Sequence, residues 1–254
     1  MRSSGKFSSK AMKPIYFVGA GPGDAELITV KGKNLLQQAD VVIYTNSLIP
    51  DQILAYCRSS VELIPSLDLS LETMIEMMIT HATNDRLVVR LHDGDPSLFS
   101  TIGEQINLLN QAGIPIEVIP GVSAFQLAAA RLKTELTVPE LVQTIILTRA
   151  SGRTKVPEKE ALMELAKHRA SLCLYLSAKH IHQAQLELLE HYPQDTPVAI
   201  CYHLGWEDEI IKLTTLDCLA TVSCAMNLSR SVLYIISPAL KQEQNRSQLY
   251  QQLQ

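Results

Sequence analysis

The sequence contains little glycine, few aromatic residues and no long apolar run. Only 11 of its 254 residues are glycine, compared with about 7% in an average globular chain. Aromatic residues make up 5%, which argues against a stacking surface for single-stranded nucleic acid. No apolar run approaches the roughly 18 residues of a membrane span. Residues 1–12 lack the apolar centre of a signal peptide, so we expect them to form a disordered tail.

Cysteine and histidine patterns give no sign of a disulfide framework or a metal site. The five cysteines are odd in number and scattered, and no CxxC pair occurs; this favours reduced core cysteines in a cytoplasmic protein. The seven histidines show no HxxxH or HExxH spacing, so we expect no protein-bound metal. The 22 basic and 26 acidic residues give a net charge of −4, which implies no general polyanion-binding surface.

The first half of the chain alternates short apolar runs with helical patterns. This rhythm predicts a mostly parallel sheet covered by helices. The expected strands are residues 15–18, 41–44, 61–64, 87–91 and 116–119. The expected helices are residues 26–38, 52–56, 71–82 and 98–111.

The second half is less regular and is predicted to be mixed. After a helix at residues 122–131, the expected strands are 144–148, 172–176, 197–202, 210–213 and 232–236, and the expected helices are 158–168, 181–190 and 216–222. The short spacing near 200–215 favours antiparallel pairing. We therefore expect an α/β protein with two α/β domains, residues 13–120 and 121–240, and a polar tail at 241–254.

Three of the glycines, Gly19, Gly21 and Gly23, cluster in GAGPGD after the first expected strand. A dinucleotide-binding loop needs glycine at the sixth position, where Asp24 stands, and an acid at the end of the second strand. Asp40 precedes that strand instead, which disfavours an NAD-binding oxidoreductase. No Gly-Lys-Ser/Thr follows, so a P-loop is excluded. The cluster alone is equally consistent with a tight turn in which Asp24 caps a helix.

Two further motifs also follow predicted strands. In HDGDP, Gly94 follows a strand, Asp95 is suited to the N-cap of the next helix and Pro96 to its first turn. In IPGVSAF, Gly121 ends a strand and a helix begins at Val122. All three motifs thus lie at the carboxyl ends of strands predicted to be parallel, where open α/β sheets bind ligands.

The order and spacing of GAGPGD, GDP and PGVSA resemble the tetrapyrrole methyltransferases of corrinoid and sirohaem synthesis, and the resemblance covers residues 13–240. LTRASGRTKVPEKE is similar to a stretch of the members that methylate C11 of precorrin-4 or cobalt-precorrin-4 in cobalamin biosynthesis. YTNSLIP and YHLGWEDE resemble the same branch, with Gly205 and Glu207 as departures. Another corrin-ring or uroporphyrinogen C-methyltransferase is the alternative, although Thr45 stands where uroporphyrinogen methylases have Asp.

The resemblance implies S-adenosylmethionine (SAM) as methyl donor, S-adenosylhomocysteine (SAH) as product, and an active cleft between the two domains. It also implies a homodimer. The cofactor contacts it implies are Pro22, Asp93, Gly94, Asp95, Leu98, Ser123, Ala124, Leu176 and Leu204.

An anionic tetrapyrrole substrate requires cations. Residues 143–157 contain Arg149, Arg153 and Lys155 and no acid, and guanidinium groups suit carboxylates, so we expect these three to bind substrate. Any cobalt would belong to the substrate. Methyl transfer to an enamine-like carbon requires no nucleophilic side chain, and no catalytic residue is assigned; Asp95 is expected to cap a helix and orient SAM. The sequence does not decide whether His92, His203 and Trp206 face the cleft or lie in the core or on the surface.

Overall fold

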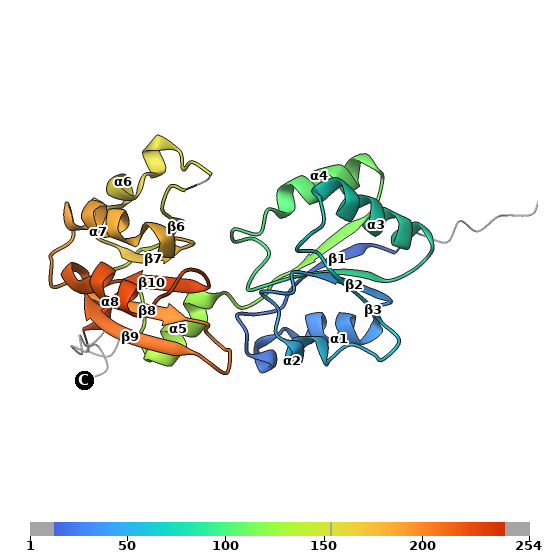
Figure 1. Cartoon of the computed structure of the whole chain (residues 1–254), viewed down its shortest axis with the longest axis horizontal. Helices are drawn as coiled ribbons and strands as arrows, with labels where there is room; N and C mark the ends of the chain where they lie inside the picture. The colour runs from blue at the N-terminus through green and yellow to red at the C-terminus, as the bar shows by residue number, and fades with distance from the viewer. Residues whose placement is uncertain (1–12, 153, 242–254) are drawn as a thin grey trace, which may run out of the picture. The chain divides into compact units, whose positions relative to one another are not determined.

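The computed structural model describes residues 13–152 and 154–241, which form two compact units (Figure 1). Unit 1 extends to Ser123 and unit 2 begins at Ala124. The boundary expected from the sequence, after Pro120, lies slightly earlier in the chain.

Unit 1 contains a five-stranded sheet in the order β3-β2-β4-β1-β5, in which every pairing is parallel. This confirms the mostly parallel sheet predicted from the sequence. The strands are β1 (Ile15–Gly19), β2 (Val41–Tyr44), β3 (Glu62–Pro65), β4 (Val88–His92) and β5 (Ile116–Ile119).

Helices cover both faces of this sheet (Figure 1). The first pair, α1 (Val30–Gln38) and α2 (Asp51–Leu54), packs on the face that carries Val42 and Leu91. The second pair, α3 (Leu71–Thr83) and α4 (Ile102–Gln111), packs on the face that carries Ile43 and Val88. Side chains on these strands alternate between two apolar layers, as in a sheet buried on both sides.

Two helices begin later than the sequence predicts. Asp24 accepts a hydrogen bond from Glu26 N at 3.0 Å and caps only the short 3-10 turn η1 (Ala25–Leu27). The N-cap of α1 is Thr29, whose Oγ1 accepts from Gly32 N at 3.1 Å. Likewise α4 begins at Ile102, so the expectation that Asp95 caps this helix is wrong. Asp95 caps a turn at Ser97 instead.

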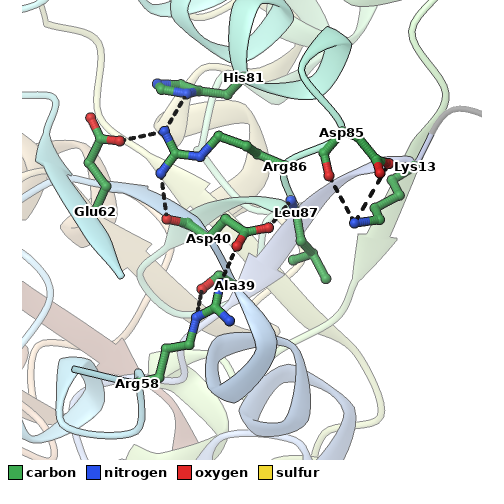
Figure 2. Close-up of polar contacts among 9 residues, drawn as sticks. All are labelled: Lys13, Ala39, Asp40, Arg58, Glu62, His81, Asp85, Arg86 and Leu87. Carbon is green, nitrogen blue, oxygen red and sulfur yellow. Dashed lines mark hydrogen bonds and ion pairs between the residues drawn. The ribbon is translucent and has the colours of Figure 1, made fainter. Parts of the chain in front are cut away.

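The amino ends of β2, β3 and β4 are joined by a charged network around Asp40 (Figure 2). Asp40 pairs with Arg58 and accepts from Leu87 N at 2.7 Å. Arg86 donates to the carbonyl of Asp40 at 3.0 Å and to Glu62 at 2.6 Å. The backbone hydrogen bond from Leu87 and the Arg58 charge lower the pKa of Asp40, although burial opposes this. Asp40 thus lies at the edge of the sheet opposite the loop that follows β1.

Unit 2 contains a mixed sheet in the order β6-β7-β10-β8-β9. Its strands are β6 (Ile145–Arg149), β7 (Ser171–Tyr175), β8 (Pro197–Tyr202), β9 (Ile210–Thr215) and β10 (Val232–Ile236). The β8–β9 pair is antiparallel, as the short spacing predicted. Since β10 runs antiparallel to both β7 and β8, while β6 and β7 are parallel, β6, β7 and β8 all point the same way.

One face of the second sheet packs against α6 (Leu162–Ala166), α7 (Ile181–Leu189) and α8 (Leu219–Ala225) around Leu172, Leu174 and Tyr234. Short 3-10 turns, η2 (Glu158–Glu160), η3 (Ala178–His180) and η4 (Leu216–Cys218), precede these helices, and η5 (Pro238–Leu240) follows β10. At the start of the unit, α5 (Ala124–Leu132) lies against β10. Within the described ranges, no helix has the length and apolar character needed to cross a membrane.

Candidate functional site

Three loops of unit 1 leave the sheet at the same edge. They follow β4, β1 and β5, which are neighbours in the sheet. The register pairs Gly19 with His92, and β5 ends at nearly the same level. Two backbone hydrogen bonds then join the first two loops: Gly94 N donates to Gly21 O at 2.8 Å, and Gly21 N donates to Gly94 O at 3.2 Å. The GAGPGD and GDP motifs therefore form one continuous backbone surface.

Close contact between backbones explains why glycine stands at positions 19 and 121. A Cβ at Gly19 would lie 2.7 Å from both the Cα of Gly121 and the carbonyl oxygen of Gly94. A Cβ at Gly121 would lie 2.2 Å from that same oxygen. Any side chain at either position would force the loops apart, so these two glycines hold the three motifs together.

Gly94 has a different environment. Its φ of +58° lies in the left-handed region that favours glycine. A Cβ there would meet only the Cα of Ser123, at 4.0 Å. Gly94 thus presents bare backbone to open space at the carboxyl end of a parallel strand, which is the position that α/β sheets use for ligands.

Asp95 connects the second loop to the third. Its Oδ2 accepts a hydrogen bond from Gly121 N at 2.9 Å, and its Oδ1 accepts from Ser97 N at 2.8 Å and from the Ser97 hydroxyl. Burial alone would raise the pKa of Asp95, but these hydrogen bonds outweigh it and lower the pKa. An ionised carboxylate with three donors fixes the loops and is poorly suited to accept a proton.

Asp93 directly follows β4, in which Arg90 and His92 are buried. Its side chain is open to solvent on one side, yet desolvation by the surrounding protein raises the pKa of its carboxyl, while Arg90 opposes the rise. Arg90 is 6% exposed and donates to the carbonyls of Ile43 and Leu91 at 3.1 and 3.2 Å. Burial lowers its pKa to about 10, so Arg90 is charged at neutral pH and attracts an ionised Asp93.

His92 is a core residue. It is buried and stacks on Phe17 with the ring centroids 5.8 Å apart. Burial and the nearby Arg90 lower its pKa to about 3, so the ring is neutral at physiological pH. The sequence left His92 open between the core, the surface and the cleft, and the structure places it in the interior of unit 1.

In unit 2 the predicted residues also gather at one edge of the sheet. Arg149 ends β6, Leu176 follows β7, and Leu204 lies just after β8, and these three strands are parallel. Leu176 has a φ of +53° and is 67% exposed, whereas Leu204 is buried. This edge is the carboxyl end of the three strands, as in unit 1.

The remaining predicted cofactor residues lie in or beside these loops. Pro22 and Leu98 are half-buried, in the loops after β1 and β4, and Ser123 is buried at the end of unit 1. Ala124 begins α5, whose next residue, Phe125, donates its N–H to the Tyr175 hydroxyl at the end of β7 at 3.1 Å.

Of the three predicted substrate-binding cations, Arg149 and Lys155 are described, and Arg153 lies outside the described residues. Lys155 is exposed. Arg149 is half-buried and donates to three carbonyls of its own loop.

The sequence missed an ordered polar cluster in the loop after β8. His203 Nδ1 lies 2.9 Å from both carboxylate oxygens of Asp208, and its ring stacks on Tyr202 and Trp206 with centroids 3.9 and 5.3 Å apart. Gly205 N donates to Glu209 at 2.7 Å. The motif YHLGWEDE carried the residues, but their mutual contacts follow from left-handed backbone at His203 and Gly205, which spacing does not reveal.

No cluster of three or more His, Cys, Asp or Glu residues suited to a metal ion occurs in residues 13–152 and 154–241. Near the three motifs, unit 1 offers backbone at Gly94, loops joined by hydrogen bonds and the exposed carboxylate of Asp93. At the carboxyl ends of its own strands, unit 2 offers the exposed side chain of Lys155.

The sequence and the fold are matched in known proteins. The family profile described as Tetrapyrrole (Corrin/Porphyrin) Methylases matches residues 14–220, and the chain belongs to this family. Members of the family use SAM as methyl donor.

Two relatives illustrate the branch. A cobalt-precorrin-4 C(11)-methyltransferase of Methanocaldococcus jannaschii is 43% identical over 229 residues, covering 90% of this chain and 88% of the relative. A precorrin-4 C(11)-methyltransferase of Pseudomonas aeruginosa is also 43% identical, over 230 residues, covering 90% of this chain and 91% of the relative.

Solved structures agree with the fold. The X-ray structure of a cobalt precorrin-4 methyltransferase, described as a cobalamin biosynthetic enzyme, matches with a TM-score of 0.88 and 41% identity, covering 90% of this chain and 96% of that one. A uroporphyrin-III C-methyltransferase from Thermus thermophilus, complexed with S-adenosylhomocysteine, matches with a TM-score of 0.76 and 26% identity, covering 92% and 96%.

The residues present fit SAM. The open space at Gly94 allows a ligand to approach the backbone closely, which a Cβ would prevent. The Asp93 carboxylate beside it is a suitable acceptor for ribose hydroxyls or an ammonium group. The loops of unit 1 thus offer backbone and a carboxylate of the kind that a nucleoside with an amino-acid tail requires.

Proposed function

We propose that this protein transfers the methyl group of SAM to C11 of precorrin-4 or cobalt-precorrin-4 in cobalamin biosynthesis. The observation that carries the proposal is 43% identity over 90% of the chain to relatives named for both forms of this reaction. Thr45 supports the same branch, because an Asp follows the equivalent tyrosine in uroporphyrinogen methylases. Thr45 Oγ1 lies 3.4 Å from the Ser66 hydroxyl at the edge of the sheet.

In this proposal both units contact the cofactor. Asp93 and the backbone at Gly94 bind it, while Asp95 holds the loops that position both. SAM, when bound, supplies an electrophilic methyl group. The full proposed set is Pro22, Asp93, Gly94, Asp95, Leu98, Ser123, Ala124, Leu176 and Leu204.

The protein's task in such a reaction is orientation. Positive charge on sulfur disappears as the methyl group moves, so no side chain has to stabilise a growing ion. Rigid loops that hold donor and acceptor in line supply a large part of the rate enhancement. The loops of unit 1 have this rigidity, because Asp95 is hydrogen-bonded to Gly121 N and because Gly19 and Gly121 allow their backbones to pack in direct contact.

The substrate side of the proposal rests on charge. Arg149, Arg153 and Lys155 lie in a segment without acids, and we propose that this segment recognises the carboxylates of an anionic tetrapyrrole. No side chain is assigned as a general base.

We also propose that the protein is a homodimer in the cytoplasm. Light scattering coupled to size-exclusion chromatography tests the dimer, and a mass of one chain would contradict it.

The decisive test is incubation of the purified protein with precorrin-4, or with its cobalt form, and SAM carrying a 13C-labelled methyl group. The label is expected at C11 of the macrocycle, as mapped by NMR. A label at another carbon would identify a different corrin-ring methylase. No label, despite SAH binding in calorimetry, would reject the substrate while retaining the cofactor.

A further inference from the structure

The described residues of the loop after β6, 150–152 and 154–156, lie around the Arg149 side chain. Its Nη1 donates to the carbonyls of Thr154 at 2.8 Å and Ala150 at 3.4 Å, and its Nη2 donates to the carbonyl of Lys155 at 3.3 Å. Two of the three guanidinium nitrogens are therefore directed at the loop's own backbone. This arrangement differs from the direct carboxylate contact expected from the sequence.

The same loop is attached to the turn after β7. Ala150 N donates to the Ser177 hydroxyl at 2.8 Å, and this hydroxyl donates to the Tyr175 carbonyl at 2.6 Å. Ser177 is completely buried. His180 lies directly over Gly152, since a Cβ at Gly152 would be 3.0 Å from its Nε2. The two segments therefore form one surface, and Gly152 leaves room for the imidazole.

This surface is basic and unpaired. Lys155 comes from the first segment, and Lys179 and His180 come from η3 in the second; all three are exposed. Elsewhere lysines pair with acids, for example Lys167 with Glu164 at 2.6 Å and Lys241 with Asp195 at 3.0 Å. Across the described ranges, no ion pair joins Lys155, Lys179 or His180 to a carboxylate.

We propose that Lys179 and His180 join Lys155 in one carboxylate-binding surface for the tetrapyrrole, and that Arg149 is a positioning residue that holds the loop carrying Lys155. This inference rests on the proposed function for the identity of its ligand. The carboxylates of the substrate supply the counter-charges that the chain itself lacks here, and the lysines and the His180 ring N–H supply the donors. Motif comparison missed Lys179 and His180, because the Gly152–His180 contact joins residues far apart in sequence.

The binding test uses uroporphyrin, a tetrapyrrole with eight carboxylates, in a fluorescence titration of the full-length protein. K179A and H180F are expected to weaken its binding by about threefold to tenfold each, while the affinity for SAH stays unchanged. K212A and H168F remove an exposed lysine and an exposed histidine elsewhere in unit 2 and serve as matched controls. If K179A and H180F bind uroporphyrin as tightly as the controls do, the proposed carboxylate-binding surface is wrong.

The role of Arg149 is tested with a double-mutant cycle between R149A and K155A. If Arg149 acts through the loop, its effect on uroporphyrin affinity will be much smaller in the K155A background. If the effects of R149A and K155A on uroporphyrin affinity multiply fully, Arg149 contacts the ligand directly. R149K, which keeps the charge but loses the planar fork, is expected to speed hydrogen exchange of the amides of Gly152 and Val156; unchanged exchange would contradict the positioning role.

These measurements separate the surface from the reaction. If uroporphyrin binding depends on Lys179 and His180 but the 13C label does not reach C11, the carboxylate surface stands and the proposed reaction is wrong. If the label reaches C11 and neither variant changes uroporphyrin affinity or the KM for the tetrapyrrole, the surface is wrong and the reaction stands.

Discussion

At the scale of single residues, four glycines in the described loops have three distinct roles. Gly19 and Gly121 permit backbone contact, Gly94 combines left-handed backbone with open space, and Gly152 makes room for His180. Gly113, just after α4, has left-handed backbone with a φ of +71° and open space but lies away from the motif loops. Gly94 and Gly113 therefore form a matched pair in conformation and differ in location.

Replacing Gly94 by Ala is expected to lower the affinity for SAH by about tenfold or more, because the methyl group occupies the space where the ligand approaches the backbone. G113A is the control. Each variant is expected to lose about 1 kcal/mol of folding free energy, since both place a Cβ on left-handed backbone. Calorimetry with SAH and chemical denaturation measure the two effects. Equal SAH affinities for G94A and G113A would place the cofactor elsewhere.

Residue roles were only partly predictable from the sequence. The motif order identified Gly94 and Asp95, but the partner of Asp95 is the amide of Gly121, 26 positions further along the chain. No local pattern reveals a contact over that separation. For the same reason the sequence assigned Asp95 to a helix cap, although the structure directs it to a turn and a neighbouring loop. The sequence also did not reveal that Arg149 donates to the carbonyls of its own loop, and its assignment to the substrate stays a prediction.

At the scale of secondary structure elements, strands were easier to predict than helix starts. Val41–Tyr44, Ile116–Ile119, Pro197–Tyr202 and Val232–Ile236 have the bounds expected, because β-branched runs between turn residues define a buried strand. Helix starts depend on which of several polar residues becomes the N-cap. Thr29 prevails over Asp24 for α1, and α4 begins after Thr101, whose left-handed φ of +51° no propensity would suggest.

In the proposed function, the cofactor binds at the carboxyl ends of the unit 1 strands, and the Asp40 network joins their amino ends; a variant of Asp40 tests this separation. D40N is expected to cost about 1 kcal/mol of folding free energy at pH 7, because it loses the Arg58 ion pair and weakens the acceptor for Leu87 N. SAH affinity is expected to stay unchanged, because Asp40 lies at the edge opposite the motif loops. D195N, which removes an exposed ion pair with Lys241, is the control and is expected to cost less than about 0.5 kcal/mol.

The pH dependence of D40N follows from the lowered pKa of Asp40. Ionised Asp40 stabilises the folded state above its ordinary pKa of 3.8, and this contribution is lost as the pH falls through the lower folded-state value. The stability difference between the wild type and D40N is therefore expected at neutral pH and should shrink below about pH 4. Denaturation curves at several pH values measure it. A constant difference down to the acid limit would mean that the carboxylate charge contributes nothing.

At the scale of the whole molecule, the two units repeat one arrangement. In each unit, the predicted ligand residues follow the carboxyl ends of parallel strands: β1, β4 and β5 in unit 1, and β6, β7 and β8 in unit 2. In each, a buried or half-buried side chain braces the exposed loop, Asp95 in one and Arg149 in the other.

If the cofactor contacts residues of both units, its binding should slow amide hydrogen exchange in both units. Hydrogen exchange followed by mass spectrometry is expected to show SAH-dependent protection of the amides around Gly94 and Ser123 in unit 1, and around Leu176 and Leu204 in unit 2. The amide of Leu87, which bonds to Asp40 at the opposite edge of the first sheet, should change little and serves as the internal control. Protection confined to unit 1 would remove Leu176 and Leu204 from the cofactor set. It would leave unit 2 with the tetrapyrrole alone, whose carboxylates its unpaired cations are suited to bind.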